Sequence, residues 1–410
     1  MNAALRRDAE EIIAASIRAV QPDEAVRRAL AGASFPGKIY LVAAGKAAWR
    51  MARAALEALD GRISGGVVCT KYGHVPAPLP GIDCYEGGHP VPDERSFAAT
   101  EAALRLVRGR TAEDTILFLL SGGGSALFEK PLVSPSELQN VTAQLLASGA
   151  DITEINTVRK RLSAVKGGRF AQLCAPARVF SIVLSDIIGD PLDMIASGPA
   201  CPDPSTCAQA RAVAARYGLS LSDEARALLD QETPKRLDNA TARITGSVRA
   251  LCRAAGEACE RLGYAPVLLT DCLRCEAREA GSFLASVART AAAHGGRQAF
   301  LAGGETVVRV TGRGRGGRNQ ELALAASIGL DGLDNAAVFS VGSDGTDGPT
   351  DAAGGYADGG TLRAMALRGI SARDFLLDNN AYEALQAVGG LIVTGPTGTN
   401  VNDLAAALIG

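Results

Sequence analysis

One pattern recurs along the chain: a short apolar run stops at Gly, Ser, Thr or Asp, and a helical pattern then follows. The runs occupy residues 38–46, 65–74, 115–125, 179–190, 264–271, 298–305, 337–347 and 390–400. Continuous apolar runs are typical of strands that are buried on both faces of a mainly parallel sheet. Ligands of such sheets bind beyond the carboxyl ends of the strands. The pattern therefore predicts an α/β fold whose polar loops gather at one edge.

The pattern weakens between Pro199 and about Thr245, where Pro, Asp, Ser and Thr precede a charged helical stretch. A chain of 410 residues is long enough for two or three domains. We therefore predict two α/β domains, over residues 1–235 and 236–410. A cleft between them would let loops from both domains meet one ligand.

Charge and composition exclude several classes of partner. Lys and Arg (42) nearly balance Asp and Glu (44), so no overall field attracts nucleic acid or a membrane surface. The sequence has no run of about 18 apolar residues, so it predicts no membrane span. The N-terminus lacks the uninterrupted apolar stretch of a signal peptide. The nine cysteines are scattered and odd in number. Together these features predict a cytoplasmic protein without nucleic-acid or membrane partners.

A glycine-rich loop follows the apolar run over residues 115–120. It consists of Ser121, Gly122, Gly123, Gly124 and Ser125. Consecutive glycines place no Cβ between their N–H groups and a ligand, and the serines add hydroxyl donors, which suits phosphate oxygens. Such a loop can also be an ordinary turn. We interpret it as a phosphate-binding or nucleotide-binding loop.

Lys46 follows the first apolar run, at the start of a helical pattern. An anion bound there would meet helix N–H groups, the positive end of the helix dipole and an ammonium group together. The alternative is a solvated lysine in the first helical turn.

The stretch ETVVRVTGRGRGGRNQE, residues 305–321, combines glycines with arginines. The glycines of its GxGxxG motif are Gly312, Gly314 and Gly317, and the arginines beside them are Arg313, Arg315 and Arg318. The motif lies between a strand and a helix, which is the context of a dinucleotide site. Clustered guanidinium groups instead suit a carboxylate or a phosphoryl group in transfer. We favour an anion-binding loop over a basic turn that faces water.

Two acidic loops also follow strands. Asp186 and Asp190 lie in the first, and Asp344 and Asp347 lie in the second. Carboxylates at strand ends can hold Mg²⁺, which in turn bridges nucleotide phosphates. Each of these aspartates could instead cap a helix or shape a turn. We predict metal binding for Asp186, Asp190 and Asp344.

Six motifs occur in an order that resembles the class II glycerate kinases. They are LLSGGGSALFEKP, INTVRKRLSAVKGGRFA, VLSDIIGDPLDMIASGP, AGGETVVRVTGRGRGGRNQELALA, VGSDGTDGPTDAAGG and TGPTGTNVNDL. The resemblance implies two three-layer α/β domains, the first Rossmann-like, with the active site in the cleft between them. It also implies phosphorylation of D-glycerate at its 2-hydroxyl, with ATP and Mg²⁺ as cofactors.

The resemblance also carries site residues. In that family the lysine of the AGK motif and the arginine of GGRNQE are the proposed active-site pair, and they fall on Lys46 and Arg318. We expect further contacts to substrate or phosphate from Glu305, Arg315, Asn319 and Asp347. The chain departs from the family at Cys275, where a glycine is expected before the following helix.

Three hypotheses of different classes remain: a glycerate 2-kinase, an NAD(P)H-dependent hydroxypyruvate reductase and a non-catalytic anion-binding protein. The GxGxxG motif favours the reductase, but no histidine has a recognisable acidic partner to move a proton beside a hydride. Acidic and basic clusters both stand at strand ends, and a phosphoryl-transfer site needs both. The kinase is therefore the preferred hypothesis.

Overall fold

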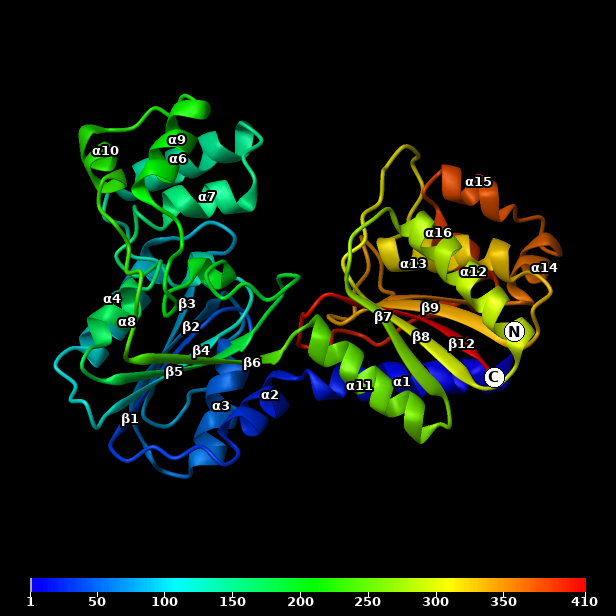
Figure 1. Cartoon of the computed structure of the whole chain (residues 1–410), viewed down its shortest axis with the longest axis horizontal. Coiled ribbons are helices and arrows are strands. Elements are labelled where there is room, and N and C mark those ends of the chain that lie inside the picture. Colours follow the sequence, from blue (N-terminus) through cyan, green and yellow to red (C-terminus); the bar gives the residue numbers. More distant parts are fainter. Residues whose placement is uncertain (1) are drawn as a thin grey trace. The chain divides into compact units, whose positions relative to one another are not determined.

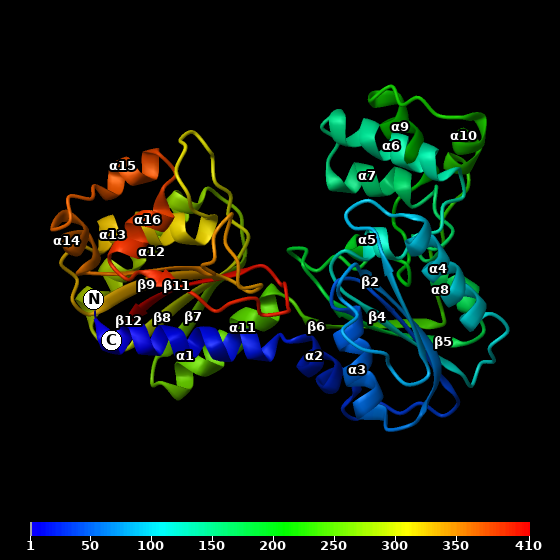
Figure 2. The same cartoon turned by 180° about the vertical axis from the view of Figure 1, so that it is seen from behind.

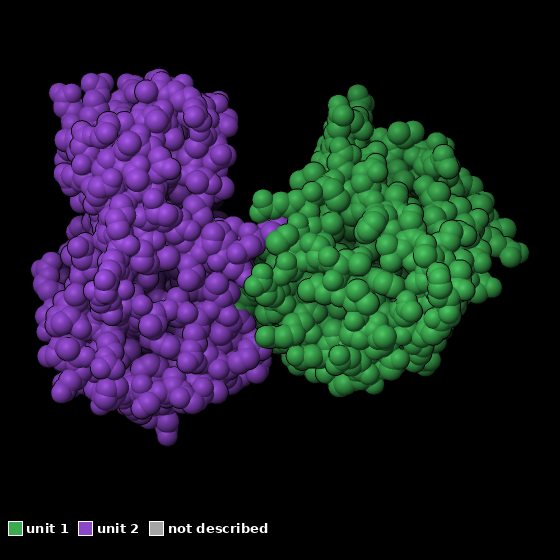
Figure 3. Space-filling view, in the orientation of Figure 1, with its two compact units in different colours: residues 1–21, 246–410 green, residues 22–245 purple. Residues whose placement is uncertain are grey.

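The computed structural model describes residues 2–410, and they form two compact units (Figure 3). Pro22–Thr245 is one unit, and Gly246–Gly410 forms the other together with the residues before Pro22. These bounds differ from the predicted domains, 1–235 and 236–410. The N-terminal helix α1 (Ala3–Ala19) belongs to the second unit, because its buried apolar residues share one core with helix α11 (Val248–Arg261). Among the described residues, no helix is both long and apolar enough to cross a membrane.

The unit Pro22–Thr245 is built on one sheet of six strands in the order β3-β2-β1-β4-β5-β6. Its strands are β1 (Ile39–Ala44), β2 (Ile63–Lys71), β3 (Ile82–Gly87), β4 (Thr115–Leu120), β5 (Arg178–Leu184) and β6 (Ala240–Gly246). Its helices are α2 (Pro22–Leu30), α3 (Ala48–Leu59), α4 (Glu94–Val107), α5 (Gly124–Leu127), α6 (Pro135–Ala147), α7 (Ile152–Arg159), α8 (Arg169–Cys174), η1 (Ile195–Ser197), α9 (Cys207–Arg216) and α10 (Asp223–Leu229).

This sheet is parallel from β3 through β5, as the continuous apolar runs predict. Alternate residues of β1 face opposite layers: Leu41 packs with α2 and α3, and Val42 packs with α4 and α8. The unit therefore has three layers (Figure 1). Helices α6, α7, α9 and α10 enclose a separate small core around Leu138, Val158 and Leu228.

The second unit holds six strands in the order β11-β10-β9-β12-β8-β7. They are β7 (Ala265–Leu273), β8 (Gln298–Gly304), β9 (Ala336–Gly342), β10 (Gly354–Asp358), β11 (Leu391–Ile392) and β12 (Asp403–Ile409). Besides α1 and α11, its helices are α12 (Ala277–His294), α13 (Arg318–Leu330), α14 (Thr361–Ala366), α15 (Ala372–Leu377) and α16 (Ala381–Ala387). Helices α1 and α11 cover one face of the sheet, and α12 and α13 cover the other (Figure 2).

The second sheet is mixed, whereas the sequence pattern predicts a mainly parallel sheet whose polar loops gather at one edge. Strand β12 runs antiparallel to both of its neighbours, β8 and β9, and β10 runs antiparallel to β9. The last apolar run, residues 390–400, contributes only the two residues of β11. Because β12 points the opposite way, its first residue, Asp403, lies at the same edge as the last residue of β8, Gly304.

Candidate functional site

The loops after β1 and β4 lie side by side where the chain order of the first sheet reverses. The strands that follow β1 extend to one side of it, and those that follow β4 extend to the other. In open α/β sheets this reversal is where ligands bind. The Lys46 N–H donates to the Gly122 carbonyl at 2.9 Å, and the Ala47 N–H donates to Ser121 Oγ at 3.1 Å. The structure thus brings Lys46 together with the glycine-rich loop.

The bare backbone of this loop lets side chains approach it closely. A Cβ on Gly122 would stand 2.3 Å from Asp186 Oδ2. A Cβ on Gly123, whose φ is +85°, would stand 3.0 Å from His89 Nε2 and 3.3 Å from Lys46 Cγ. Burial, aided by the charge of Lys46, lowers the pKa of His89. Asp186 and His89 therefore line the loop, and His89 was not among the predicted site residues.

The predicted metal ligands are divided between the two units. Asp186 and Asp190 follow β5, whereas Asp344 follows β9, where its Oδ1 accepts the Thr346 N–H at 3.0 Å. Asp190 has a positive φ of 54°, and its buried Oδ1 has no hydrogen-bond partner. Within residues 2–410, no group of three or more His, Cys, Asp or Glu side chains could hold a metal ion. Protein-held Mg²⁺ commonly has only one or two carboxylates and takes its other oxygens from phosphates and water.

Arg318 is the first residue of α13, and two carboxylates from neighbouring strand ends hold its guanidinium group. Nε and Nη2 donate to Asp403 Oδ2 and Oδ1 at 2.5 and 3.0 Å. Nη1 donates to Glu305 Oε1 at 3.0 Å. Burial alone would lower the pKa of Arg318, but the bonds to Asp403 and the charge of Glu305 outweigh it and raise that pKa. Burial also raises the pKa of Asp403 to about 6, which Arg318 opposes in part.

Asp347 fixes the start of α13. Its carboxylate accepts the backbone N–H groups of Asn319 and Gln320 at 3.1 and 2.9 Å, and both side-chain amides donate to it as well. Its side chain is buried, and that burial raises its pKa against these hydrogen bonds. Asp347 and Asn319, both predicted to contact substrate or phosphate, thus bond to each other beneath Arg318. This arrangement sets the direction of the helix from which Arg318 projects.

The glycines of the GxGxxG motif pack against the protein's own chain. A Cβ on Gly312 would stand 2.3 Å from the backbone of Asp378, and one on Gly314 would stand 2.3 Å from Asn380 Cβ. A Cβ on Gly317 would stand 2.3 Å from the Asp347 carboxyl carbon. In a dinucleotide site the second glycine of the motif, here Gly314, gives the pyrophosphate its close approach. Here neighbouring residues occupy that space, which removes the main support for the reductase hypothesis.

Arg315, predicted to contact substrate or phosphate, stacks on an aromatic ring. Its guanidinium carbon lies 3.8 Å from the centre of the Tyr382 ring, and its backbone N–H donates to Asn380 Oδ1 at 3.1 Å. The side chain is exposed. These contacts anchor the loop that carries Arg313 and Arg315 to the start of α16.

Asp403, like His89, lies at the candidate site but was not among the predicted site residues. It is the last residue but one of the motif TGPTGTNVNDL and comes directly before the apolar run LAAALI, which starts at Leu404. An acidic residue at the start of an apolar run is a weak signal, because it can equally end a loop. Only the antiparallel placement of β12 beside β8 brings it to Arg318.

Comparisons with known proteins identify the family. The description "Domain of unknown function (DUF4147)" belongs to the family model that matches residues 8–230, and the MOFRL family model matches residues 298–403. The D-glycerate 2-kinase of Thermotoga maritima is 50% identical over 99% of this chain and 98% of its own length. The chain belongs to the class II glycerate kinase family.

Solved structures agree with this family assignment. The crystal structure of glycerate kinase from Thermotoga maritima matches 99% of this chain and 100% of its own with a TM-score of 0.96 at 50% identity. A structure from Pyrococcus horikoshii matches 99% and 98% with a TM-score of 0.94 at 38% identity. The predicted family and the predicted pair of α/β domains are confirmed. The roles of individual residues in this glycerate kinase family member stay predictions.

Proposed function

We propose that this chain transfers the γ-phosphoryl group of ATP to the 2-hydroxyl of D-glycerate, giving 2-phosphoglycerate and ADP. The observation that carries the proposal is the meeting of Lys46, the bare loop Ser121–Ser125 and Asp186 where the first sheet reverses its order. Phosphoryl transfer needs little covalent chemistry from the protein beyond positioning and charge stabilisation. A cation, backbone N–H groups and a carboxylate at one place provide both.

The nucleotide phosphates are assigned to the glycine-rich loop. The loop runs into α5, which begins at Gly124, and its three glycines place no side chains of their own beside their N–H groups, while Asp186 and His89 approach Gly122 and Gly123. Lys46 supplies a compact positive charge for the transferring phosphoryl group. Negative charge that develops on the phosphoryl oxygens during transfer is then stabilised by a group already in place.

Mg²⁺, when bound with ATP, neutralises charge on the β- and γ-phosphates. Asp186 and Asp190 are the residues that would hold it. The buried Asp190 Oδ1 without a hydrogen-bond partner and the close approach of Asp186 to the bare loop both fit a cation there. Asp344, in the other unit, is less suited, because its Oδ1 already shapes a turn.

D-Glycerate carries a carboxylate beside the reacting hydroxyl, and we assign that carboxylate to Arg318. A guanidinium group has five N–H donors, of which Asp403 and Glu305 engage three. The donors beyond these three can meet the substrate in a planar, two-point geometry. During the reaction, the 2-hydroxyl oxygen forms a bond to the γ-phosphorus as the bond to the β–γ bridging oxygen breaks, and the hydroxyl proton is released to water.

Two parallel assays test the proposal. Purified protein receives D-glycerate, ATP and Mg²⁺ in one, and hydroxypyruvate with NADH or NADPH in the other. Enolase consumes 2-phosphoglycerate directly, so a signal from enolase without a mutase identifies the phosphorylated hydroxyl. We expect ADP and enolase-competent product, and loss of turnover after chelation that added Mg²⁺ restores. Nicotinamide oxidation without ADP formation would overturn the kinase assignment.

A further inference from the structure

The segment Ile195–Gly198 has an unusual backbone. Ala196 and Ser197 have positive φ angles of 49° and 61°, and Gly198 follows with 63°. Residues other than glycine rarely adopt this left-handed backbone conformation, and two such residues in succession are energetically costly. Such a conformation persists only where the surroundings fix it.

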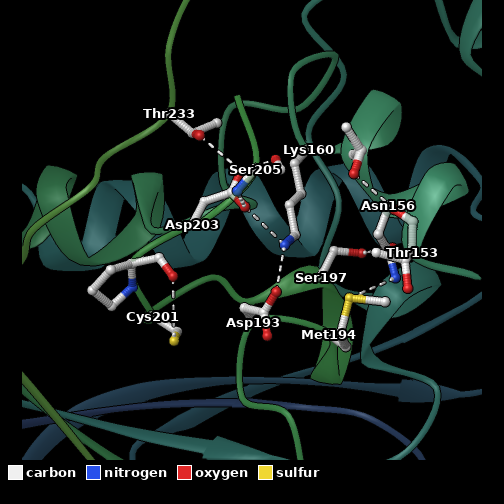
Figure 4. A network of polar contacts seen from close by, with 12 residues as sticks. Thr153, Asn156, Lys160, Asp193, Met194, Ser197, Cys201, Asp203, Ser205 and Thr233 are labelled. Atoms are coloured by element: carbon white, nitrogen blue, oxygen red, sulfur yellow. Dashed lines mark hydrogen bonds and ion pairs between the residues drawn. The ribbon is translucent and has the colours of Figure 1, made fainter. Parts of the chain in front are cut away.

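Three hydrogen bonds fix the pair Ala196–Ser197, two from the stretch just before α8 and one to α7. The Gly167 N–H donates to the Ser197 carbonyl at 2.9 Å, and Lys166 Nζ donates to the Ala196 carbonyl at 3.4 Å. Ser197 Oγ donates to Asn156 Oδ1 at 2.7 Å, a contact seen in Figure 4. The left-handed pair is thus held on both sides.

The same segment presses against the glycine-rich loop. A Cβ on Gly124 would stand 2.9 Å from Ala196 Cβ, so only glycine lets the loop approach this closely. Lys166 Nζ also donates to the carbonyls of Ser125 and Phe128, at 2.9 and 3.3 Å. One ammonium group therefore joins the helical turn that ends the loop to the left-handed segment behind it.

Lys166 is fully buried, and its charge is balanced inside the protein. Glu129, also fully buried, lies 3.5 Å from Nζ, and Arg159 lies 4.0 Å from the same carboxylate. Burial lowers the pKa of Lys166 to about 8, against the opposing effect of Glu129. An apolar side chain of similar length could fill this space without removing an ion pair from water. The ammonium group is thus better explained by the carbonyls that it orients than by stability.

We propose that Lys166 is a positioning residue that sets the geometry of the phosphate loop Ser121–Ser125 by joining its helical turn to the left-handed pair Ala196–Ser197. This rests on the proposed kinase function, in which the loop binds the nucleotide phosphates. The loop N–H groups keep their direction because the carbonyl end of α5 is fixed on an interior cation.

A matched pair of variants tests the proposal. Lys166→Met keeps the length of the side chain and removes the charge. The control is Lys160→Met, since Lys160 is also buried and ion-paired, with Asp203 at 3.0 Å and Asp193 at 3.2 Å (Figure 4), and among the described residues its ammonium group bonds to these two carboxylates and not to the loop. We expect Lys166→Met to raise KM for ATP and Kd for the non-hydrolysable analogue AMP-PNP with Mg²⁺ by about tenfold. We expect both constants to stay within about twofold in Lys160→Met.

A second variant separates positioning from stability. Ala196→Gly relieves the left-handed strain but removes the Cβ that supports Gly124. We expect its melting temperature to hold or rise while KM for ATP rises severalfold. A purely structural segment would not move stability and nucleotide affinity in opposite directions. Unchanged nucleotide constants in this variant would overturn the proposal, even if Lys166→Met does not fold.

Hydrogen exchange of the amides of residues 121–128 gives a readout that needs neither substrate nor turnover. We expect faster exchange there in Ala196→Gly, and in Lys166→Met relative to Lys160→Met. Equal exchange in wild type and Ala196→Gly would refute the positioning role. A wild type that binds AMP-PNP but does not phosphorylate glycerate would overturn the proposed function alone.

Discussion

Arg318→Lys keeps the positive charge of Arg318 but removes its fork. In the structure Nε and Nη2 engage both oxygens of Asp403, and Nη1 engages Glu305. An ammonium group offers no fixed pair of parallel donors, so it cannot hold Asp403 and also bind a substrate carboxylate at two points. Hydrogen bonds to charged groups contribute about 1.5–3 kcal/mol each. Loss of one bond to glycerate should therefore raise KM for glycerate roughly 10- to 100-fold, because about 1.4 kcal/mol is a factor of ten.

The assay follows ADP release at saturating ATP over a range of D-glycerate concentrations. Arg313→Lys is the matched control, because Arg313 is an exposed arginine of the same loop. We expect the control to keep both constants within about twofold. A folded Arg318→Lys variant with unchanged KM would refute the assignment to the carboxylate. If kcat fell while KM stayed constant, Arg318 would act on the phosphoryl group instead.

Three further changes probe the same chemistry. Lys46→Ala should lower kcat and kcat/KM together by on the order of a hundredfold or more, since it removes a charge used mainly in the transition state. If a folded variant kept both constants, Lys46 would not belong to the site. Gly123→Val should raise KM for ATP and lower the melting temperature, because its side chain meets His89 and Lys46; Gly109→Val, at φ +70° with nothing within 4 Å, controls for backbone strain. The pKa of Asp403, raised to about 6, predicts that kcat/KM falls as pH drops through 6, when protonation releases Arg318. Asp403→Asn should remove that acid limb, and its persistence would assign the limb to another group.

The sequence predicts the first sheet well, because its strands are continuous apolar runs. Leu117 and Phe118 face opposite cores, and a parallel strand buried on both faces has this composition. It predicts the second sheet less well. The alanine-rich strand β12 has few β-branched residues, and the glycines of β10 (GGYAD) match no strand pattern. Both run antiparallel to their neighbours, a choice that depends on contacts far apart in the chain.

For the candidate site, local motifs predicted the loops but could not predict what fills them. The sequence near Gly312 fits a dinucleotide motif, and only the packing of Asp378 against it shows that the space is occupied. Asp347 was predicted to contact ligand, yet its carboxylate caps α13 through contacts 27 and 28 residues away in the chain. His89 was not among the predicted site residues, and its approach to Gly123 depends on the fold of the whole sheet.

Helix α1 has a consequence for how the protein is made. It leaves the ribosome before residues 22–245, but the surface that covers Ile12 and Ile13 lies in α11 and in strands encoded after residue 245. At about 5–20 residues per second, synthesis of residues 22–245 takes roughly 10 to 50 s, and the apolar face of α1 waits that long for its partner. A fragment that begins at Gly246 would lack this helix and expose an apolar surface. A circular permutant that joins α1 directly to the C-terminal end would instead let that unit assemble from one uninterrupted segment.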